Sequence, residues 1–113
     1  MKSQITAFFI LVLGTSSVFA ANKDAACNAY MQSAMIGQSE TDRLHLAVAA
    51  MNDVYELNFN SKELIYLEAS LLKKISAGEV DQTNVENATY FGCVNELSAA
   101  DKKIMQDQLK SLL

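Results

Sequence analysis

No proline interrupts this chain of 113 residues, and its apolar residues recur every three to four positions. That spacing matches the 3.6-residue turn of an α-helix, whereas a half-buried strand alternates every second residue. The segment after residue 39 shows the pattern most clearly, because one face of it carries Leu44, Val48, Met51 and Tyr55. The pattern predicts an all-α fold, a small compact bundle of four to five helices.

Start and stop signals place the predicted helices. Side chains that accept hydrogen bonds from a first helical turn stand at Ser39, Asn60 and Ser98, and they predict helix starts there. Thr83 followed by Glu86 has the spacing of a capping box and predicts a further start. With a first helix from about residue 22, five helices are expected, and glycines follow the first and third of them.

Residues 1–20 have the pattern of a secretory signal peptide. The positive charge of Lys2 precedes an apolar run, residues 5–13, and small residues ending in Ala20 occupy the positions that a signal peptidase recognises. We expect cleavage after Ala20, which leaves residues 21–113 as a single helical domain.

A membrane anchor and a lipoprotein are the two alternative interpretations of these first residues. A membrane anchor needs roughly 20 apolar residues, and the run in this chain is about half as long. A lipoprotein would need different residues before Cys27, because the charged Asp24 three positions earlier departs from the lipobox pattern. The expected location is therefore the periplasm, or the cell exterior, with no membrane contact after signal cleavage.

The two cysteines, Cys27 and Cys93, both lie in the expected exported part and favour one disulfide in an oxidising compartment. A metal pair or a reactive thiol is the alternative, but a metal site would need further ligands at suitable spacing. A bond that closes so long a loop contributes roughly 4 kcal/mol in the loop-entropy model. Gly92 costs about 1 kcal/mol inside a helix, which suggests a close approach of the first helix beside the disulfide.

Acidic residues outnumber basic ones by 13 to 9, for a net charge of −4. Loss of Lys2 with the signal peptide lowers the basic total to 8 and gives a net charge of about −5. The sequence has no basic run or stripe, which argues against nucleic acid and anionic lipid as partners. A basic protein partner fits this balance, although a solvated acidic face would carry the same charge.

Candidate catalytic residues are few. The single histidine, His45, follows Asp42 by three positions, so either a catalytic Asp–His contact or a surface interaction is consistent with the spacing. Asp53 and Glu56 are close enough for acid–base work, but both belong to the expected solvent side of a helix. With the cysteines in a disulfide no nucleophile is identified. We expect no enzyme activity, no catalytic residues, no cofactor and no metal site.

Two connections between predicted helices carry the candidate contact residues. The first offers Tyr55 and Phe59 as aromatic anchors beside asparagines. The second offers the acidic residues Glu79 and Asp81, which suit a positively charged groove on a partner. The alternatives are structural: Phe59 closes the core, and Val80, between the two acids, packs under the following helix.

The sequence around each cysteine adds a resemblance. Cys27 opens an early Cys-Asn-Ala-Tyr, and Cys93 lies in a late Phe-Gly-Cys-Val-Asn-Glu-Leu. With the signal peptide and the helical pattern, the stretch from Cys27 to about Leu97 resembles the periplasmic immunity proteins that neutralise type VI secretion amidases. In that family an α-helical dimer blocks the amidase groove with a protruding loop. The resemblance implies a toxin or effector protein as partner and allows a homodimer, but no loop motif is matched, so it assigns no binding residue.

Two further classes stay open. A periplasmic acid-stress chaperone is also small, helical and held by one disulfide, although its cysteines lie closer together than those of this chain. A small periplasmic binding or structural protein without a recognisable signature is the other. A toxin gene beside this one would favour inhibition, whereas an isolated gene induced by acid would favour the chaperone.

Overall fold

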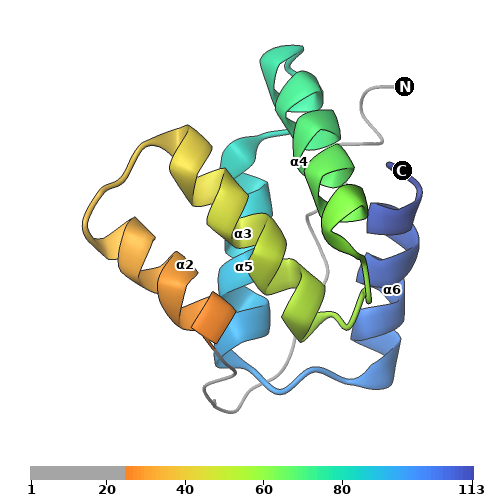
Figure 1. Ribbon diagram of the computed structural model, residues 1–113. Coiled ribbons are helices and arrows are strands. Elements are labelled where there is room, and N and C mark those ends of the chain that lie inside the picture. The colour runs from red at the N-terminus through yellow and green to blue at the C-terminus, as the bar shows by residue number, and fades with distance from the viewer. Residues whose placement is uncertain (1–24) are drawn as a thin grey trace.

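The computed structural model describes residues 25–113, and that part of the chain folds into five α-helices without a strand (Figure 1). The helices are α2 (Ala25–Met35), α3 (Glu40–Val54), α4 (Ser61–Ser76), α5 (Gln82–Val94) and α6 (Ala99–Lys110). The predicted all-α bundle is therefore confirmed. The expected signal peptide, residues 1–20, and the first residues of the expected domain, 21–24, lie outside the described part of the chain.

Helix α3 is the centre of the fold. It packs against both α2 and α5, and Figure 1 shows it crossing the middle of the molecule with α4 and α6 on the side opposite α2. Its predicted face is buried, because each of these side chains is at most 2% exposed: Leu44, Val48, Met51 and the following Tyr55. Burying one large apolar side chain contributes about 1.5–3 kcal/mol, so this face supplies much of the stability of the bundle.

Three predicted helix starts are confirmed. The Oγ atoms of Ser39 and Ser98 accept hydrogen bonds from the N–H of the third helical residue, at 3.2 and 3.0 Å. Asn60 and Glu63 form a capping box, in which each side chain accepts a hydrogen bond from the other's backbone N–H. The predicted stops are also confirmed, since the glycines two residues after α2 and α4 have φ values of 74° and 78°.

The predicted cap of α5 is wrong, because Asp81 rather than Thr83 holds that position. Asp81 has an extended backbone, and its side chain accepts a hydrogen bond from the Thr83 N–H at 3.1 Å. Glu86 does not close the expected capping box, since its carboxylate turns to Arg43 of α3. The sequence pattern predicts that this helix runs to about Leu97, but it ends at Val94.

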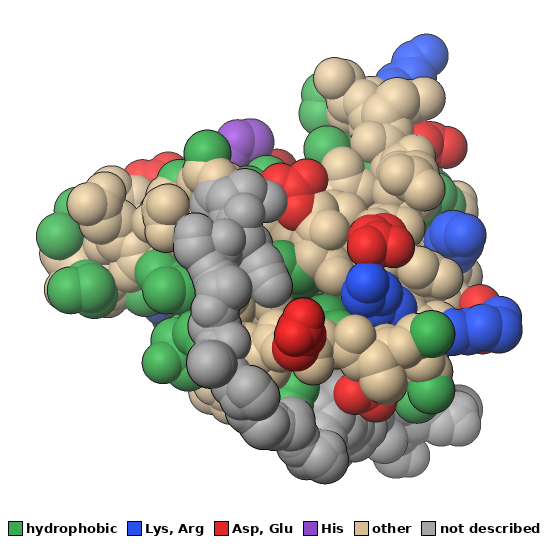
Figure 2. Space-filling view, turned by 90° about the horizontal axis from the view of Figure 1, so that it is seen from below, with side chains coloured by type: hydrophobic (Ala, Val, Ile, Leu, Met, Phe, Trp, Pro, Cys, Tyr) green, Lys and Arg blue, Asp and Glu red, His purple; other side chains and the backbone are tan. Residues whose placement is uncertain are grey.

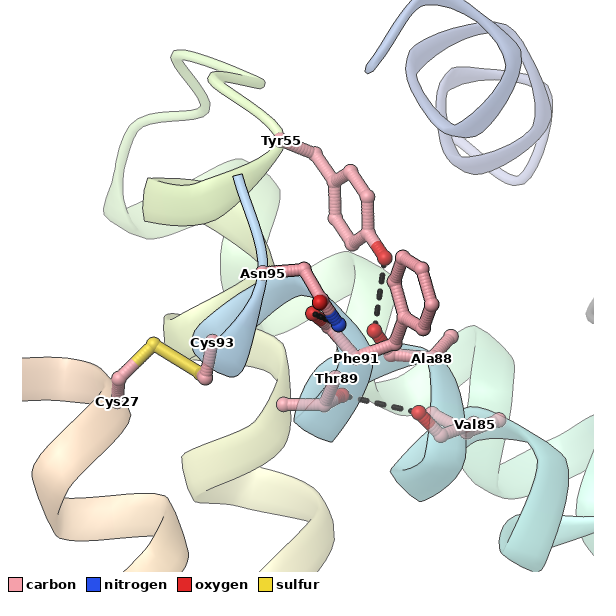
Figure 3. Close-up of a disulfide and its surroundings, with 8 residues drawn as sticks. All are labelled: Cys27, Tyr55, Val85, Ala88, Thr89, Phe91, Cys93 and Asn95. Atoms are coloured by element: carbon pink, nitrogen blue, oxygen red, sulfur yellow. Dashed lines mark hydrogen bonds between the residues drawn. A yellow bond between two sulfur atoms is a disulfide. The ribbon is translucent and has the colours of Figure 1, made fainter. Parts of the chain in front are cut away.

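The expected disulfide joins Cys27 in the first turn of α2 to Cys93 near the end of α5 (Figure 3). The neighbouring Gly92 faces a different helix from the one expected. A Cβ at this position would lie 2.7 Å from Val54 Cγ2 and 3.2 Å from Tyr55 Cζ. The close approach that requires glycine is therefore between α5 and the C-terminal end of α3, not between α5 and α2.

Helix α4 buries only a narrow stripe, formed by Leu67 and Leu71. The sequence pattern of α4 also predicts that Ile65 widens this stripe, but this prediction is wrong, because the Ile65 side chain is 68% exposed. Ile65 instead lies with Tyr66 of α4 and with Leu113, which follows α6, around a pocket at the surface.

Candidate partner-binding groove

A groove of about 540 Å³ lies between α2 and α5. Its α2 wall contains Met31, Ala34 and Met35, and its α5 wall contains residues along one face of that helix: Thr83, Asn87 and Tyr90. Figure 2 shows hydrophobic side chains gathered on the side of the molecule where α2 lies. We call this feature the α2–α5 groove.

The α2 wall is apolar because this helix has more apolar residues than it can bury. Cys27, Tyr30 and Ser33 recur every three residues, and these are the buried residues of the helix. The adjacent face carries Met31, which is partly buried against the core, and Met35, which stays at the surface. Met35 is 82% exposed, more than any other large apolar side chain of the described residues.

A further exposed apolar side chain stands on the opposite wall of the groove, where Tyr90 of α5 is 54% exposed. Single exposed apolar residues are ordinary on protein surfaces, whereas apolar side chains grouped around a groove mark an interaction site. The α2–α5 groove is therefore the candidate functional site.

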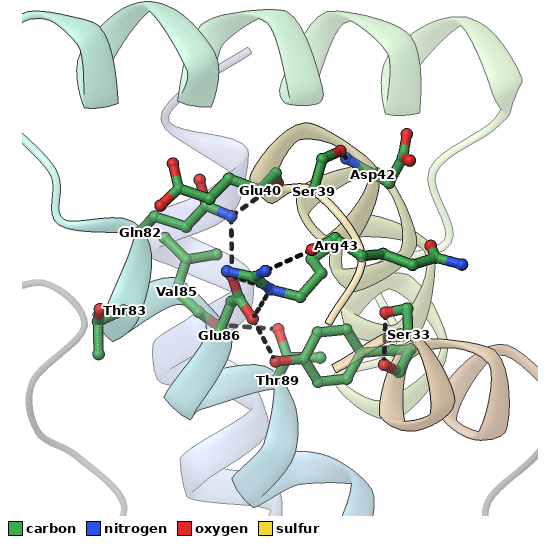
Figure 4. Close-up of polar contacts among 12 residues, drawn as sticks. Ser33, Ser39, Glu40, Asp42, Arg43, Gln82, Thr83, Val85, Glu86 and Thr89 are labelled. Carbon is green, nitrogen blue, oxygen red and sulfur yellow. Dashed lines mark hydrogen bonds and ion pairs between the residues drawn. The ribbon is translucent and has the colours of Figure 1, made fainter. Parts of the chain in front are cut away.

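An ion pair between Arg43 of α3 and Glu86 of α5 forms the floor of the groove (Figure 4). Arg43 Nε donates to both carboxylate oxygens of Glu86, at 3.0 and 3.1 Å, and Nη1 donates to the Gln38 carbonyl at 2.6 Å. Glu86 also accepts hydrogen bonds from the Tyr30 hydroxyl and from the Gln82 amide, both at 2.8 Å. Because these groups come from α2, α3 and α5, the network fixes the two walls relative to each other.

Burial and hydrogen bonding set the charges of this floor. Burial alone would raise the pKa of Glu86, but the hydrogen bonds from Arg43, Gln82 and Tyr30 outweigh it and hold the pKa below its ordinary value of 4.5. The pKa of Tyr30 is raised, first by burial and then by the adjacent carboxylate. The hydrogen bond to Glu86 raises the pKa of Arg43. At neutral pH the floor therefore holds one positive charge, one negative charge and a neutral phenol.

The lowered pKa of Glu86 limits the acid–base chemistry of the floor. A carboxyl group that acts as a general acid near neutral pH needs a raised pKa, and that of Glu86 is lowered. Among residues 25–113, no group of three or more His, Cys, Asp or Glu side chains is placed to hold a metal ion. In the same range, no helix has both the length and the apolar character needed to cross a membrane.

The structure corrects the expectation that Tyr55 and Phe59 are anchors on an exposed connection. Both side chains are buried, and the Tyr55 hydroxyl donates to the Ala88 carbonyl at 2.7 Å (Figure 3). The connection folds inward because the Asn52 amide holds Phe59 at both of its backbone groups, donating to the carbonyl at 3.3 Å and accepting from the N–H at 2.9 Å. The alternative, in which Phe59 closes the core, is the arrangement observed.

The acidic candidates Glu79 and Asp81 lie at the surface and also have structural roles. The Glu79 carboxylate is 3.6 Å from Lys74 Nζ, and Asp81 caps α5. Val80, between them, is buried, as the structural alternative predicted. Neither acid lines the groove, and a role for either in partner contact stays a prediction.

The residues weighed for catalysis are dispersed over the surface. His45 Nδ1 lies 2.7 Å from Glu68 Oε1 of α4 rather than beside the acid three residues earlier in the chain. Glu56 is exposed and accepts a hydrogen bond from Lys102 Nζ at 2.8 Å, and Asp53 is exposed as well. None of these side chains lines the groove.

Sequence reasoning missed the groove. A signal was present on α2, where Met31 and Met35 widen the apolar sector beyond the face that the helix buries. The pairing of Arg43 with Glu86 had no signal, because 43 residues separate the two and neither position shows a pattern on its own.

Comparison of the chain with protein-family models, with curated proteins and with solved structures finds no match.

Proposed function

We propose that this chain is an exported, non-catalytic binding protein that protects against a secreted enzyme by occluding it. The partner class is a cell-wall-degrading toxin, such as a type VI secretion amidase, and the place of action is the periplasm. The observation that carries the proposal is the α2–α5 groove, where the exposed side chains of Met35 and Tyr90 flank an internally neutralised ion pair.

The groove supports tight binding because it is held in place before a partner arrives. The disulfide ties the first turn of α2 to the end of α5, and the network around Glu86 joins the same two helices to α3. A preformed site loses little conformational entropy on binding, which raises affinity for a given contact area. Thioether side chains such as those of Met31 and Met35 adapt to the shape of a partner surface.

The sequence supports the class of partner. The signal-peptide pattern directs the domain to the compartment where cell-wall enzymes act. The sequence around Cys27 and Cys93 resembles the immunity proteins of amidases, and the acidic balance of the chain favours a basic partner.

Two tyrosines provide a matched test. Tyr90 lines the groove and Tyr66 lies on α4, yet both are inside helices and both are 54% exposed. Each toxin encoded beside the gene is sent to the periplasm of cells that also express this chain, and survival is scored for the wild type, Tyr90→Asp and Tyr66→Asp. We expect protection by the wild type and by Tyr66→Asp and loss of protection with Tyr90→Asp, at equal protein levels.

Two results would overturn the proposal in different ways. Protection that persists in Tyr90→Asp and fails in Tyr66→Asp would move the contact surface from the groove to α4. A wild-type chain that neither protects against nor binds any neighbouring gene product would refute the inhibitor function.

A further inference from the structure

The charged groups on the floor of the groove are already paired with each other, so the floor does not suit a charged ligand. Each carboxylate oxygen of Glu86 accepts two hydrogen bonds, one of them from Arg43 Nε, so an incoming cation would have to displace existing donors. The charge of Arg43 is already compensated by the Glu86 carboxylate, 3.0 Å away. An incoming carboxylate would therefore be attracted by Arg43 and repelled by Glu86. Moving a charge out of water without a partner of its own is costly.

Within the part of the chain that the structure describes, the floor also has hydrogen-bond donors without an acceptor, on the guanidinium of Arg43. Arg43 donates through Nε and Nη1, and among the described residues its Nη2 makes no hydrogen bond. A guanidinium has five N–H donors in a planar arrangement. A neutral carbonyl oxygen is therefore the acceptor that suits this position, since it forms a hydrogen bond without adding a charge.

The walls add two requirements. Met31, Met35 and Tyr90 offer apolar contacts, which suit an aliphatic or aromatic side chain. Asn87 and Thr83, on the α5 wall, carry side-chain donors and acceptors that can pair with main-chain groups. A helix has its backbone groups already paired, whereas an extended or irregular segment presents free N–H and C=O groups.

We infer that the α2–α5 groove takes an uncharged, extended peptide segment of the partner, with an apolar side chain between the methionines and a main-chain carbonyl on Arg43. This inference rests on the proposed function and specifies the chemistry of its contact. The occupant is a loop of the target enzyme rather than a helix or a charged side chain.

The methionines allow a direct test by NMR, using the full chain with methyl-labelled methionine. Met31 and Met35 report on the groove, while Met51 and Met105 are buried in the core and serve as internal controls. Arg43 is the only arginine in the sequence, so the guanidinium signal in the NMR spectrum is assigned to it without ambiguity. The probes are three blocked tripeptides, acetyl-Gly-Leu-Gly-amide and its analogues with Asp or Lys in place of Leu.

We expect the Leu peptide to move the signals of Met31, Met35 and the Arg43 guanidinium in a saturable manner. The Met51 and Met105 signals stay fixed, and the Asp and Lys peptides bind about tenfold more weakly or worse. Tyr90→Asp weakens binding of the Leu peptide, and Tyr66→Asp leaves it unchanged. Equal binding of a charged peptide, or a Leu peptide that moves no groove signal, would overturn the inference.

The peptide and survival experiments can fail separately. Lost protection in Tyr90→Asp together with no binding of the Leu peptide would leave the inhibitor function standing and refute the stated chemistry. Leu-selective binding together with unchanged protection in Tyr90→Asp would keep the site and refute its role in inhibition.

Discussion

Arg43 Nε lies 3.0 Å from Glu86 Oε1, and this pair connects the first turn of α3 to α5 beneath the groove. Tyr30 of α2 donates to the same carboxylate oxygen at 2.8 Å. Three helices therefore meet at a single carboxyl group. The shape of the groove depends on that group remaining ionised.

The lowered pKa of Glu86 predicts a specific pH dependence of stability. Because the folded-state pKa lies below the ordinary value of 4.5, the carboxylate stabilises the fold fully above that value and loses its contribution as pH falls through the folded pKa. Glu86→Gln should therefore lower the free energy of unfolding near neutral pH and have a smaller effect at about pH 3. Urea denaturation at both pH values measures this difference.

The control for the Glu86 prediction is Glu96→Gln, which removes one negative charge from an exposed position. It should change the free energy of unfolding little at either pH. An equal loss for Glu86→Gln at both pH values would show that the carboxylate is not stabilised by its ionised form.

Gly92→Ala is predicted to destabilise the protein, although the same change in an open helix would gain about 1 kcal/mol. The added Cβ would lie 2.7 Å from Val54 Cγ2, so we expect a loss of about 1–3 kcal/mol. A double-mutant cycle with Val54→Ala checks the cause, because removing Cγ2 should recover part of the loss in unfolding free energy. Strict additivity of the two substitutions would contradict the clash.

Reduction of the disulfide is predicted to cost roughly 4 kcal/mol, because the bond closes a loop between residues 66 positions apart. Thermal unfolding with and without reductant measures the loss. The Cys27→Ala/Cys93→Ala variant should match the reduced wild type and be insensitive to reductant. Free labelling of both thiols in unreduced native protein would contradict the bond itself.

Tyr55→Phe is predicted to reduce stability without affecting partner binding, because the hydroxyl donates to the Ala88 carbonyl in the interior. One such hydrogen bond contributes about 1 kcal/mol, and the substitution removes it. Tyr66→Phe, at an exposed position, serves as the control and should be nearly neutral. A partner affinity that falls with Tyr55→Phe at unchanged stability would restore Tyr55 as a contact residue.

The parts of the fold set by local chemistry could be predicted from the sequence. The caps at Ser39, Asn60 and Ser98 depend on residues within one helical turn, and the buried face of α3 repeats with the helical period. The cap of α5 was misplaced because Asp81 and Thr83 are both good capping residues two positions apart, and the sequence alone does not rank them.

The groove could not be predicted, because it depends on contacts between distant residues. Glu86 has acceptable local partners in its own helix, and only the fold brings Arg43 to it. Contacts between distant residues also decide which apolar side chains are buried. Phe59 and Ile65 are both apolar, yet Phe59 is buried and Ile65 is exposed. The Asn52 amide holds the connection with Phe59 inward, whereas α4 buries only Leu67 and Leu71.

The most direct test of the account is the affinity of the purified chain for its toxin partner, measured by calorimetry for the wild type, Tyr90→Asp and Tyr66→Asp. The two variants introduce the same charge at equally exposed tyrosines, so any difference between them reports position alone. We predict that Tyr90→Asp raises Kd about tenfold or more, and that Tyr66→Asp leaves it within about twofold of the wild-type value. Equal Kd values for Tyr90→Asp and the wild type would show that the α2–α5 groove is not the binding surface.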